Sequence, residues 1–456
     1  MYTRLSGQAR QWQKILALNY KIMSLNFKKM VSLDNPLRLM YHKVRAILAN
    51  IVYGFPSQKM TVIGITGTNW KTTTTNIIAK WLREAWYKVF MFSTINIIMW
   101  DEEVVNNTKM TSPDAFVLQK LLKQAKERWC TIAVIETSSH SILMNRNFGL
   151  NYDFAVLTNI TQDHLDLHKT MDNYVDTKLQ LFKNLIIYKR KQWVKKIAII
   201  NNESDYKDLF LAETFDNLYT YWKDSSSTIK FDNVKSTFEW TSFDVKIAWS
   251  KFTIDTPLRW TFNIYNILAS IWVFIAFWLK PEQIQKVIKS INWVAWRMEE
   301  VENNWKFKIF VDYAHTPDAL VQVLDTIRSI EWVKRIITVF WATGDRDKTK
   351  RPIMWKIVSD KSDVVVLTQD DDYSEKTESI IKDVIPGIER KEWDNFWVIT
   401  DRKEAIRTAL LTAEEYDVIL IAGKWDEHLM LTNAWPVEWH DRDVIEGILG
   451  EMEGEK

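Results

Sequence analysis

GITGTNWKTTTT, residues Gly64–Thr75, joins a predicted strand to a predicted helix. The apolar run MTVIGITG before it has the composition of a buried strand, and TTTNIIAKWLREA after it has helical periodicity. A glycine-containing turn in this context, followed by lysine and threonine, is typical of a phosphate-binding loop, because backbone N–H groups and the helix N-terminus attract anions. Lys71 would supply positive charge to the β- and γ-phosphates, and Thr72 would offer its hydroxyl to Mg²⁺.

The pattern around this loop predicts an α/β protein with several domains. Residues 1–56 read as a helical N-terminal segment. Residues 57–292 alternate strands and helices, which indicates a central P-loop ATPase domain with a mostly parallel sheet, and residues 228–260 within it read as short antiparallel strands. Residues 293–456 form a second βα series, which predicts a C-terminal Rossmann-like domain.

Composition limits the function classes. The chain of 456 residues has a net charge of +2 with both signs interspersed, so we expect no nucleic-acid partner. The single cysteine, Cys130, excludes an internal disulfide and a cysteine zinc site. The longest apolar run, 267–279, is too short to span a bilayer, so we expect a cytoplasmic protein without stable membrane insertion. The basic N-terminal stretch, from Arg4 to Lys29, is either a solvated helix face or an arm that contacts a membrane surface or RNA.

Tryptophan outnumbers glycine, 24 to 11, whereas average usage would give roughly 32 glycines. Several tryptophans stand where glycine is usual: Trp70 before the lysine of the loop, Trp305 in a predicted hairpin turn, and Trp278 and Trp332 after helical segments. We hypothesise that many are glycines in the protein as made, encoded by UGA read as glycine. A genuinely tryptophan-rich chain is the alternative.

With Trp70 taken as glycine, TGTNGKTTT resembles the signature of the Mur ligases, the ATP-dependent amide synthetases of peptidoglycan precursor assembly. The resemblance runs from about residue 57 to about 445 and is strongest to the UDP-N-acetylmuramoyl-tripeptide synthetases, which add the third residue of the stem peptide. It implies that ATP is bound by Gly67, Thr68, Asn69, Lys71, Thr72 and Thr73.

Two further blocks imply a site for two Mg²⁺ ions. IETSSHS (135–141) resembles the block in which Glu136 is a metal ligand, and TNITQDHLDLHKTMDNYVDTKLQLF (158–182) implies His164 as a second ligand and Lys178 as a carbamylated lysine. Together with Thr72 these residues make the metal set, and with Lys71 they make the catalytic set. Without the resemblance, Lys178 reads as a surface lysine of a helix and His164 as a structural histidine.

The resemblance assigns the remaining nucleotide contacts to FNIYNILAS, VAWRMEEV and FVDYAHTPDAL. Asn263 and Asn266 are expected near adenine and ribose, Arg297 at the phosphates, and Asp312 at the ribose hydroxyls. An alternative for Asn263 is that it caps a helix.

Substrate contacts are implied by TSPD, IETSSHS, FWATGDRDKTKRP, DDDY and IAGKWDEH; they are Thr111, Ser112, Ser139, Arg346, Asp371, Tyr373 and Glu427. Ser112 can equally cap a helix with Pro113 in its first turn. Enzymes that add diaminopimelate carry D-N-P-R where this chain has Asp370–Tyr373. The missing arginine and the added acids favour a diamine such as lysine or ornithine.

We therefore expect a monomeric ligase that uses ATP and Mg²⁺ to join a free amino acid to a UDP-N-acetylmuramoyl-dipeptide, or a related muramoyl peptide, through an acyl phosphate. Only about 56 residues precede the ATPase domain, so the resemblance leaves open whether the acceptor carries UDP. The alternatives are the Mur-type subunit of the lipid II amidotransferase, a ligase like folylpolyglutamate synthetase, and, if Trp70 is genuine, an inactive nucleotide-binding protein.

Overall fold

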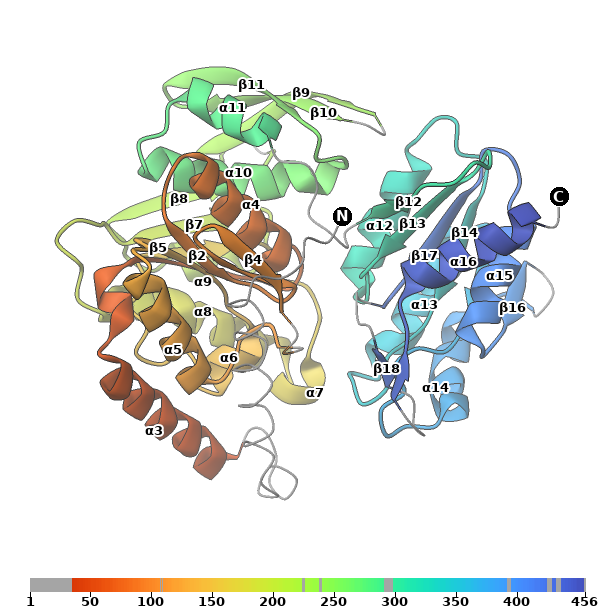
Figure 1. Ribbon diagram of the computed structural model, residues 1–456, viewed down its shortest axis with the longest axis horizontal. Coiled ribbons are helices and arrows are strands. Elements are labelled where there is room, and N and C mark those ends of the chain that lie inside the picture. The colour runs from red at the N-terminus through yellow and green to blue at the C-terminus, as the bar shows by residue number, and fades with distance from the viewer. Residues whose placement is uncertain are drawn as a thin grey trace. The chain divides into compact units, whose positions relative to one another are not determined.

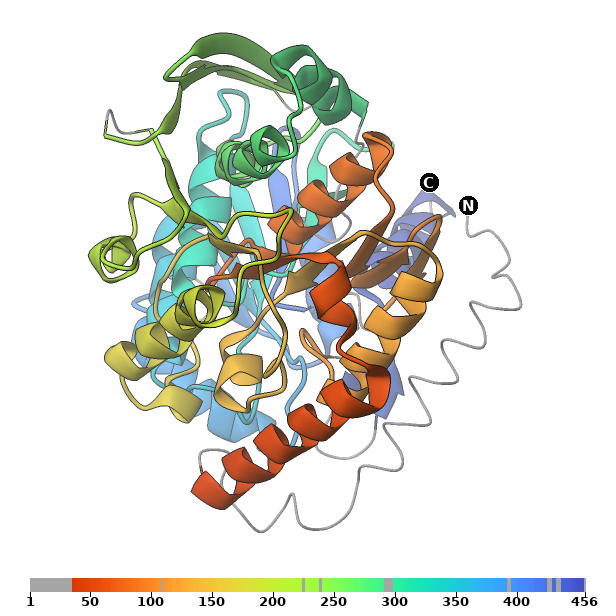
Figure 2. The same cartoon turned by 90° about the vertical axis from the view of Figure 1, so that its left-hand side faces the viewer.

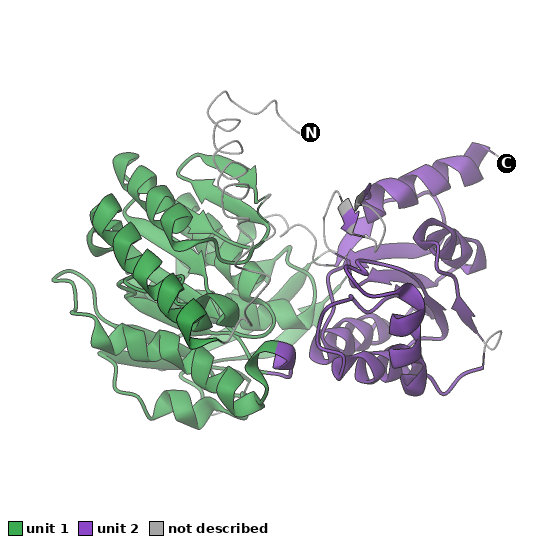
Figure 3. Ribbon diagram, turned by 90° about the horizontal axis from the view of Figure 1, so that it is seen from below, with its two compact units in different colours: residues 1–160, 167–293 green, residues 161–166, 294–456 purple. Residues whose placement is uncertain are grey.

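The computed structural model describes residues 35–106, 108, 110–223, 226–237, 240–290, 298–391, 395–424, 429–431 and 436–454. The chain forms two compact units, one of residues 1–160 and 167–293, the other of residues 161–166 and 294–456 (Figure 3). Each unit has its own sheet with helices on it, so the predicted α/β class is confirmed.

The sheet of the first unit has the strand order β11-β10-β9-β8-β7-β6-β1-β5-β2-β3-β4. Its middle is parallel, with β1 hydrogen-bonded between β5 and β6. The strands are β1 (Thr61–Thr66), β2 (Val89–Phe92), β3 (Asn96–Met99), β4 (Glu102–Val105), β5 (Ile132–Glu136), β6 (Phe154–Leu157), β7 (Ile197–Asn201), β8 (Asn217–Tyr221), β9 (Ile229–Ser236), β10 (Thr241–Ile247) and β11 (Ser250–Thr256). Every residue of β1 is buried, as expected for a strand covered on both faces, whereas burial alternates along the antiparallel β10.

Helices cover both faces of this sheet. Helices α4 and α10 pack on each other above it in Figure 1, and α5, α6 and α8 lie below it. The helices are α3 (Pro36–Tyr53), η1 (Pro56–Lys59), α4 (Lys71–Glu84), α5 (Ala115–Glu127), α6 (Ser139–Leu143), α7 (Leu165–His168), α8 (Met171–Ile187), α9 (Lys207–Leu211), α10 (Thr261–Ala276) and α11 (Pro281–Ser290). Because the strands are parallel, their C-terminal ends meet at one edge, where the loop after β1 lies.

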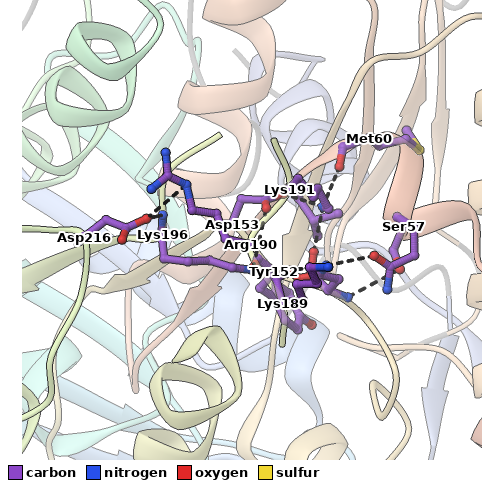
Figure 4. Close-up of polar contacts among 12 residues, drawn as sticks. Ser57, Met60, Tyr152, Asp153, Lys189, Arg190, Lys191, Lys196 and Asp216 are labelled. Carbon is purple, nitrogen blue, oxygen red and sulfur yellow. Dashed lines mark hydrogen bonds and ion pairs between the residues drawn. The ribbon is translucent and has the colours of Figure 1, made fainter. Parts of the chain in front are cut away.

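A buried ionic cluster holds the opposite edge of the same sheet (Figure 4). Asp153 directly precedes β6, and its carboxylate accepts a hydrogen bond from the Val62 N–H of β1 at 2.9 Å and one from Lys191 Nζ at 2.5 Å. Lys191 also donates to the Met60 carbonyl at 2.7 Å. Burial lowers the pKa of Lys196, which directly precedes β7 and lies 3.7 Å from Asp153, to about 8. The cluster therefore ties the N-terminal ends of β1, β6 and β7 together.

The N-terminal region contributes α3 to the first unit, where it packs along α5. Asn35 caps α3 by accepting a hydrogen bond from the Leu37 N–H at 2.9 Å, with Pro36 in the first turn, and Gly54 ends the helix in the left-handed conformation at φ 71°. No helix in the described part of the chain is both long and apolar enough to cross a membrane.

The second unit has the strand order β12-β13-β17-β14-β15-β16, parallel except for β12. Its elements are β12 (Glu299–Val301), β13 (Lys308–Asp312), α12 (Pro317–Arg328), β14 (Ile336–Phe340), α13 (Lys350–Lys361), β15 (Val364–Leu367), α14 (Thr377–Val384), η2 (Ile385–Gly387), β16 (Phe396–Val398), α15 (Arg402–Thr412), β17 (Val418–Ala422), β18 (Leu429–Leu431), β19 (Pro436–Glu438) and α16 (Asp441–Gly454). The buried strands β14, β15 and β17 form its core.

Candidate active site

The predicted phosphate-binding loop connects β1 to α4. Gly67 has no room for a side chain, because a Cβ there would lie 1.8 Å from Thr158 Oγ1. The loop thus passes directly against the end of β6, the strand beside β1. Its backbone turns at Trp70, which precedes α4 in the left-handed conformation at φ 68°.

Thr158 and Asn159, directly after β6, brace this loop. Thr158 Oγ1 donates to the Asn69 carbonyl at 2.7 Å, the Asn69 N–H donates to Asn159 Oδ1 at 2.8 Å, and the Thr68 N–H donates to the Asn159 carbonyl at 2.9 Å. No sequence motif assigned a role to either residue. The available signal was their position after a parallel strand, since ligand sites of such sheets lie outside the carboxyl ends.

Thr72 and Glu136 meet at the start of α4. Thr72 Oγ1 donates to Glu136 Oε1 at 3.0 Å, and the Thr94 N–H donates to Glu136 Oε2 at 2.8 Å. Glu136 is the last residue of β5 and is buried. Lys71 lies beside them and donates from Nζ to the Thr68 carbonyl at 2.6 Å. A hydroxyl and a carboxylate at a helix N-terminus are oxygen donors that suit a phosphate-bound Mg²⁺.

Lys178 is buried in α8 and directed at the same loop. Its Nζ donates to the Gly67 carbonyl at 2.6 Å and lies 4.4 Å from the centre of the Tyr174 ring, whose hydroxyl is 3.0 Å from Thr68 Oγ1. The reading of Lys178 as a surface lysine is therefore wrong. The helix directs this side chain inward, although periodicity alone gave no indication of a site.

His164 belongs to the short segment 161–166, which clusters with the second unit. Its Nε2 lies 3.3 Å from Asp163 Oδ2, and Lys350 Nζ donates to Asp163 Oδ1 at 3.0 Å. Burial opposes ionisation of Asp163, but the charges of His164, Lys350 and His315 outweigh it and hold its pKa well below the usual range. In the described ranges, no three His, Cys, Asp or Glu side chains gather as a metal site. The metal role of His164 stays a prediction.

The predicted substrate serines follow β4 and β5, with Ser112 on the loop before α5 and Ser139 at the start of α6. Ser112 Oγ donates to the Glu136 carbonyl at 3.1 Å, beside the half-buried Thr111. The reading of Ser112 as a helix cap is wrong, because Asp114 caps α5 and accepts from the Phe116 N–H at 3.0 Å. Asp114 is two residues nearer to the helix.

Ser139, at the start of α6, pairs with His168, a histidine to which no sequence motif gave a role. Its Oγ lies 3.1 Å from Nε2 of the buried His168, and Thr177 Oγ1 of α8 lies 3.4 Å from Nδ1 of the same ring. His168 thus links the two segments that carry Ser139 and Lys178.

Asn263 and Asn266 connect α10 to the helix of the phosphate loop. Asn266 Nδ2 donates to Asn263 Oδ1 at 3.1 Å, and Thr74 Oγ1 of α4 donates to Asn266 Oδ1 at 3.0 Å. The alternative of Asn263 as a cap is wrong, since Trp260 occupies the cap position and makes no capping bond through its side chain. Thr73, the last predicted loop residue, is buried within α4.

In the second unit, Asp312 ends β13, and its two oxygens accept from the Met298 and Ala314 N–H groups, each at 2.7 Å. Arg346 lies with its guanidinium 5.5 Å from the centre of the Tyr373 ring. The predicted residues Arg297 and Glu427 lie outside the described residues.

The loops that carry Arg346 and Tyr373 are locked together. The Gly344 N–H donates to the Asp371 carbonyl at 2.8 Å, and a Cβ at Gly344 would lie 1.9 Å from the Asp372 carbonyl oxygen. Asp371 also pairs with the buried Lys424 at 3.1 Å, which pairs in turn with Asp370 at 2.8 Å. Both carboxylates are therefore occupied by a lysine of the protein itself.

The backbone supports the hypothesis about the tryptophans. Among the described residues, six tryptophans have positive φ: Trp70, Trp86, Trp100, Trp129, Trp260 and Trp278. The left-handed region of φ is rarely adopted by a bulky residue, whereas glycine adopts it readily. The buried indole N–H groups of Trp81, Trp341 and Trp355 have no hydrogen-bond partner, a costly state for tryptophan. The expectation for Trp332 is wrong, since its φ is not positive and α12 ends four residues before it.

Comparison with known proteins agrees with this geometry. Residues 65–274 match the Mur ligase middle domain, and residues 296–425 match the Mur ligase glutamate ligase domain. The UDP-N-acetylmuramoyl-L-alanyl-D-glutamate–2,6-diaminopimelate ligase of Clostridium botulinum is 37% identical over 413 residues, covering 90% of this chain and 82% of the relative. The Bacillus cereus enzyme of the same name is 35% identical, covering 93% and 86%.

Solved structures give the same result. A UDP-N-acetylmuramoyl-L-alanyl-D-glutamate–2,6-diaminopimelate ligase superimposes with a TM-score of 0.61 at 26% identity, covering 90% of this chain and 83% of that one. Folylpolyglutamate synthase of Mycobacterium tuberculosis, complexed with ADP and AMPPCP, shares the fold with a TM-score of 0.67 at 14% identity, covering 91% and 95%. The protein therefore belongs to the Mur ligase family of ATP-dependent amide ligases.

Proposed function

We propose that this protein adds the third residue of the peptidoglycan stem peptide, by joining a muramoyl-dipeptide carboxylate to the amine of a diamino acid at the expense of ATP. One observation carries the proposal. Thr72, Glu136 and Lys178 converge on a braced phosphate loop in a chain 37% identical to a ligase of that name.

The chemistry has two displacements. The acceptor carboxylate attacks the γ-phosphorus of ATP, the bond to ADP breaks, and an acyl phosphate forms. The amine then attacks the acyl carbon, and phosphate leaves while the amine loses a proton. The N-terminus of α4 and the Lys71 ammonium would face the phosphates and stabilise the charge that develops on them.

Magnesium fits the donors that the structure presents. Thr72 and Glu136 would hold one ion. The resemblance to the family adds Lys178, as a carbamate, and His164 as expected ligands of a second ion. Bound Mg²⁺ would neutralise phosphate charge. Lys178 can be tested separately. Mass spectrometry of intact protein should detect a carbamate that disappears in Lys178→Arg. Protein depleted of bicarbonate should lose activity, and adding bicarbonate back should restore that activity.

The geometry favours diaminopimelate over lysine or ornithine as the incoming amino acid. The acids of the DDDY block were expected to attract a second amine, but Asp370 and Asp371 already pair with Lys424. Arg346 brings a guanidinium to the loop where Tyr373 replaces the expected arginine, so a second carboxylate still has a partner. The curated relatives are named for the same substrate.

The test is ADP release by protein carrying glycine at position 70, with every combination of ATP, muramoyl dipeptide (with and without UDP) and each of the three diamino acids. Release should require both acceptor and amino acid and should be fastest with diaminopimelate. Release that needs neither would overturn the proposal. Ligation of glutamate to folate would indicate a folylpolyglutamate synthetase, and amidation of lipid II with a glutaminase partner would indicate the amidotransferase. We place the reaction in the cytoplasm and expect a monomer, which light scattering will check.

A further inference from the structure

Helix α3 carries its apolar side chains on the outside. Eight of them recur at helical spacing along one stripe and are exposed: Leu37, Met40, Tyr41, Val44, Ile47, Leu48, Ile51 and Val52. Phe55, two residues after the helix, is exposed as well. Leu37 is 74% exposed and Val52 61%. Single exposed apolar residues are ordinary, but a continuous stripe of this length marks an interaction surface. We call these nine residues the α3 stripe.

The opposite face of α3 is fixed to the body of the first unit by small and polar residues. Ala46 and Ala49 pack on Ala115 of α5, and Asn50 Nδ2 donates to the Phe148 carbonyl at 3.0 Å. Arg45 pairs with Asp114 at 3.0 Å. These contacts orient α3 so that its stripe faces away from α5; Figure 2 shows the helix along the margin of the molecule. The exposure of the stripe is therefore a consequence of how the helix docks.

The region around the stripe is strongly basic. Residues 35–60, which include α3, hold no acid and four bases: Arg38, Lys43, Arg45 and Lys59. The whole chain is almost neutral, at +2. A second copy of this surface would bring like charges together, and residues 1–33 bear no acid that could neutralise α3. Nucleic acid would leave the apolar stripe unburied.

We propose that the α3 stripe docks the protein on an anionic lipid surface. The stripe enters the boundary between headgroups and acyl chains, and the exposed Lys43 and Lys59 pair with lipid phosphate. Tyr41 and Phe55, both exposed on the stripe, are aromatic residues of the kind that lie at this boundary. Docking is peripheral and requires no spanning helix.

The test is cosedimentation of the full chain with vesicles of phosphatidylcholine alone or mixed with phosphatidylglycerol. We expect binding to the mixed vesicles that weakens as salt rises. Leu48→Glu with Ile51→Glu should reduce it at least about tenfold. Ile187→Glu with Leu411→Glu is the matched control, because both positions are also exposed, at 72% and 65%, and the charge change is the same. The melting temperatures of both variants show whether they fold.

Several results would overturn the proposal. One is equal binding to both kinds of vesicle, and another is no binding to either. A third is an equal loss of vesicle binding in the control variant. The last is binding that requires removal of residues 1–34, since that segment would then cover the stripe in the intact chain. A dimer by light scattering that the α3 variant abolishes would assign the stripe to a second copy instead.

Discussion

Gly54 follows helix α3, and Trp86, Trp129 and Trp278 follow helices α4, α5 and α10, yet the chain leaves all four helices with the same geometry. The residue lies in the left-handed region, at φ 71° for the glycine and 68°, 64° and 63° for the tryptophans. In each case its N–H and the next one donate to carbonyls three and five residues earlier. This is the helix ending that glycine favours.

The difference lies in what each residue costs there. Left-handed backbone costs an L-residue about 1–2 kcal/mol and glycine almost nothing. Burial does not offset this cost, since the three tryptophans are 88%, 76% and 91% exposed. The backbone conformation at these four positions is therefore the one that glycine favours, although three of them are tryptophan in the sequence.

The largest expected effect is at the phosphate loop. Trp70 has the same left-handed φ and stacks its indole on Tyr265, with ring centres 6.0 Å apart. Trp70→Gly should clear the space for phosphate and strengthen ATP binding at least about a hundredfold, or about 3 kcal/mol. Isothermal titration calorimetry measures this. Trp193→Gly, at an exposed position without positive φ, should leave the affinity unchanged; equal affinity with tryptophan or glycine at position 70 would break the comparison.

The next effect concerns the core of the second unit. Trp355 in α13 is fully buried, and its indole N–H has no partner. Truncating a well-fitted core aromatic costs about 3–5 kcal/mol, and Phe307→Ala in the same unit should show that loss. Trp355→Gly should instead keep or raise the free energy of unfolding, by up to about 3 kcal/mol as overpacking is relieved. Urea denaturation compares them, and a loss equal to that of Phe307→Ala would identify a genuine tryptophan.

The helix ends themselves should change less. Trp86→Gly, Trp129→Gly and Trp278→Gly should each raise the free energy of unfolding by about 1 kcal/mol, and Gly54→Ala should lower it by about the same amount. Thermal melting of the four variants gives the signs directly. If glycine at position 86 destabilised the protein, the equivalence of the four ends would be lost.

The last prediction concerns the pH dependence of stability that His42 of α3 contributes. Burial, helped by Arg146, lowers the pKa of His42 from 6.5 to about 4. The unfolded chain therefore binds the proton more readily, so His42 contributes stability above pH 6.5 that is lost as the pH falls toward 4. Between pH 7.5 and 5.5 we expect a loss of about 1 kcal/mol. Denaturation at both pH values should show a smaller loss in His42→Gln; an equal loss would show that other groups titrate.

Local patterns predicted much of the fold and part of the site. Strand and helix periodicity located β1, the phosphate loop and α4, because each depends on consecutive residues. Contacts between distant segments could not be predicted from the sequence. Thr158 and Asn159 reach the phosphate loop from the end of another strand, and Lys424 forms ion pairs with Asp370 and Asp371 of the DDDY block. The inward orientation of Lys178 likewise became visible only in the packed helix. Ser112 was predicted as the cap of α5, but Asp114 caps it, because both residues lie near the helix start and either side chain could accept the hydrogen bond.

The left-handed tryptophans have a practical consequence for anyone who makes this protein. If UGA encodes these positions, an ordinary laboratory host would read the first of them, residue 70, as a stop and release a peptide of 69 residues. A suppressor host that inserts tryptophan would yield full-length chains with a bulky residue at each of these left-handed positions. Only a gene rewritten with standard glycine codons would deliver the enzyme its backbone describes.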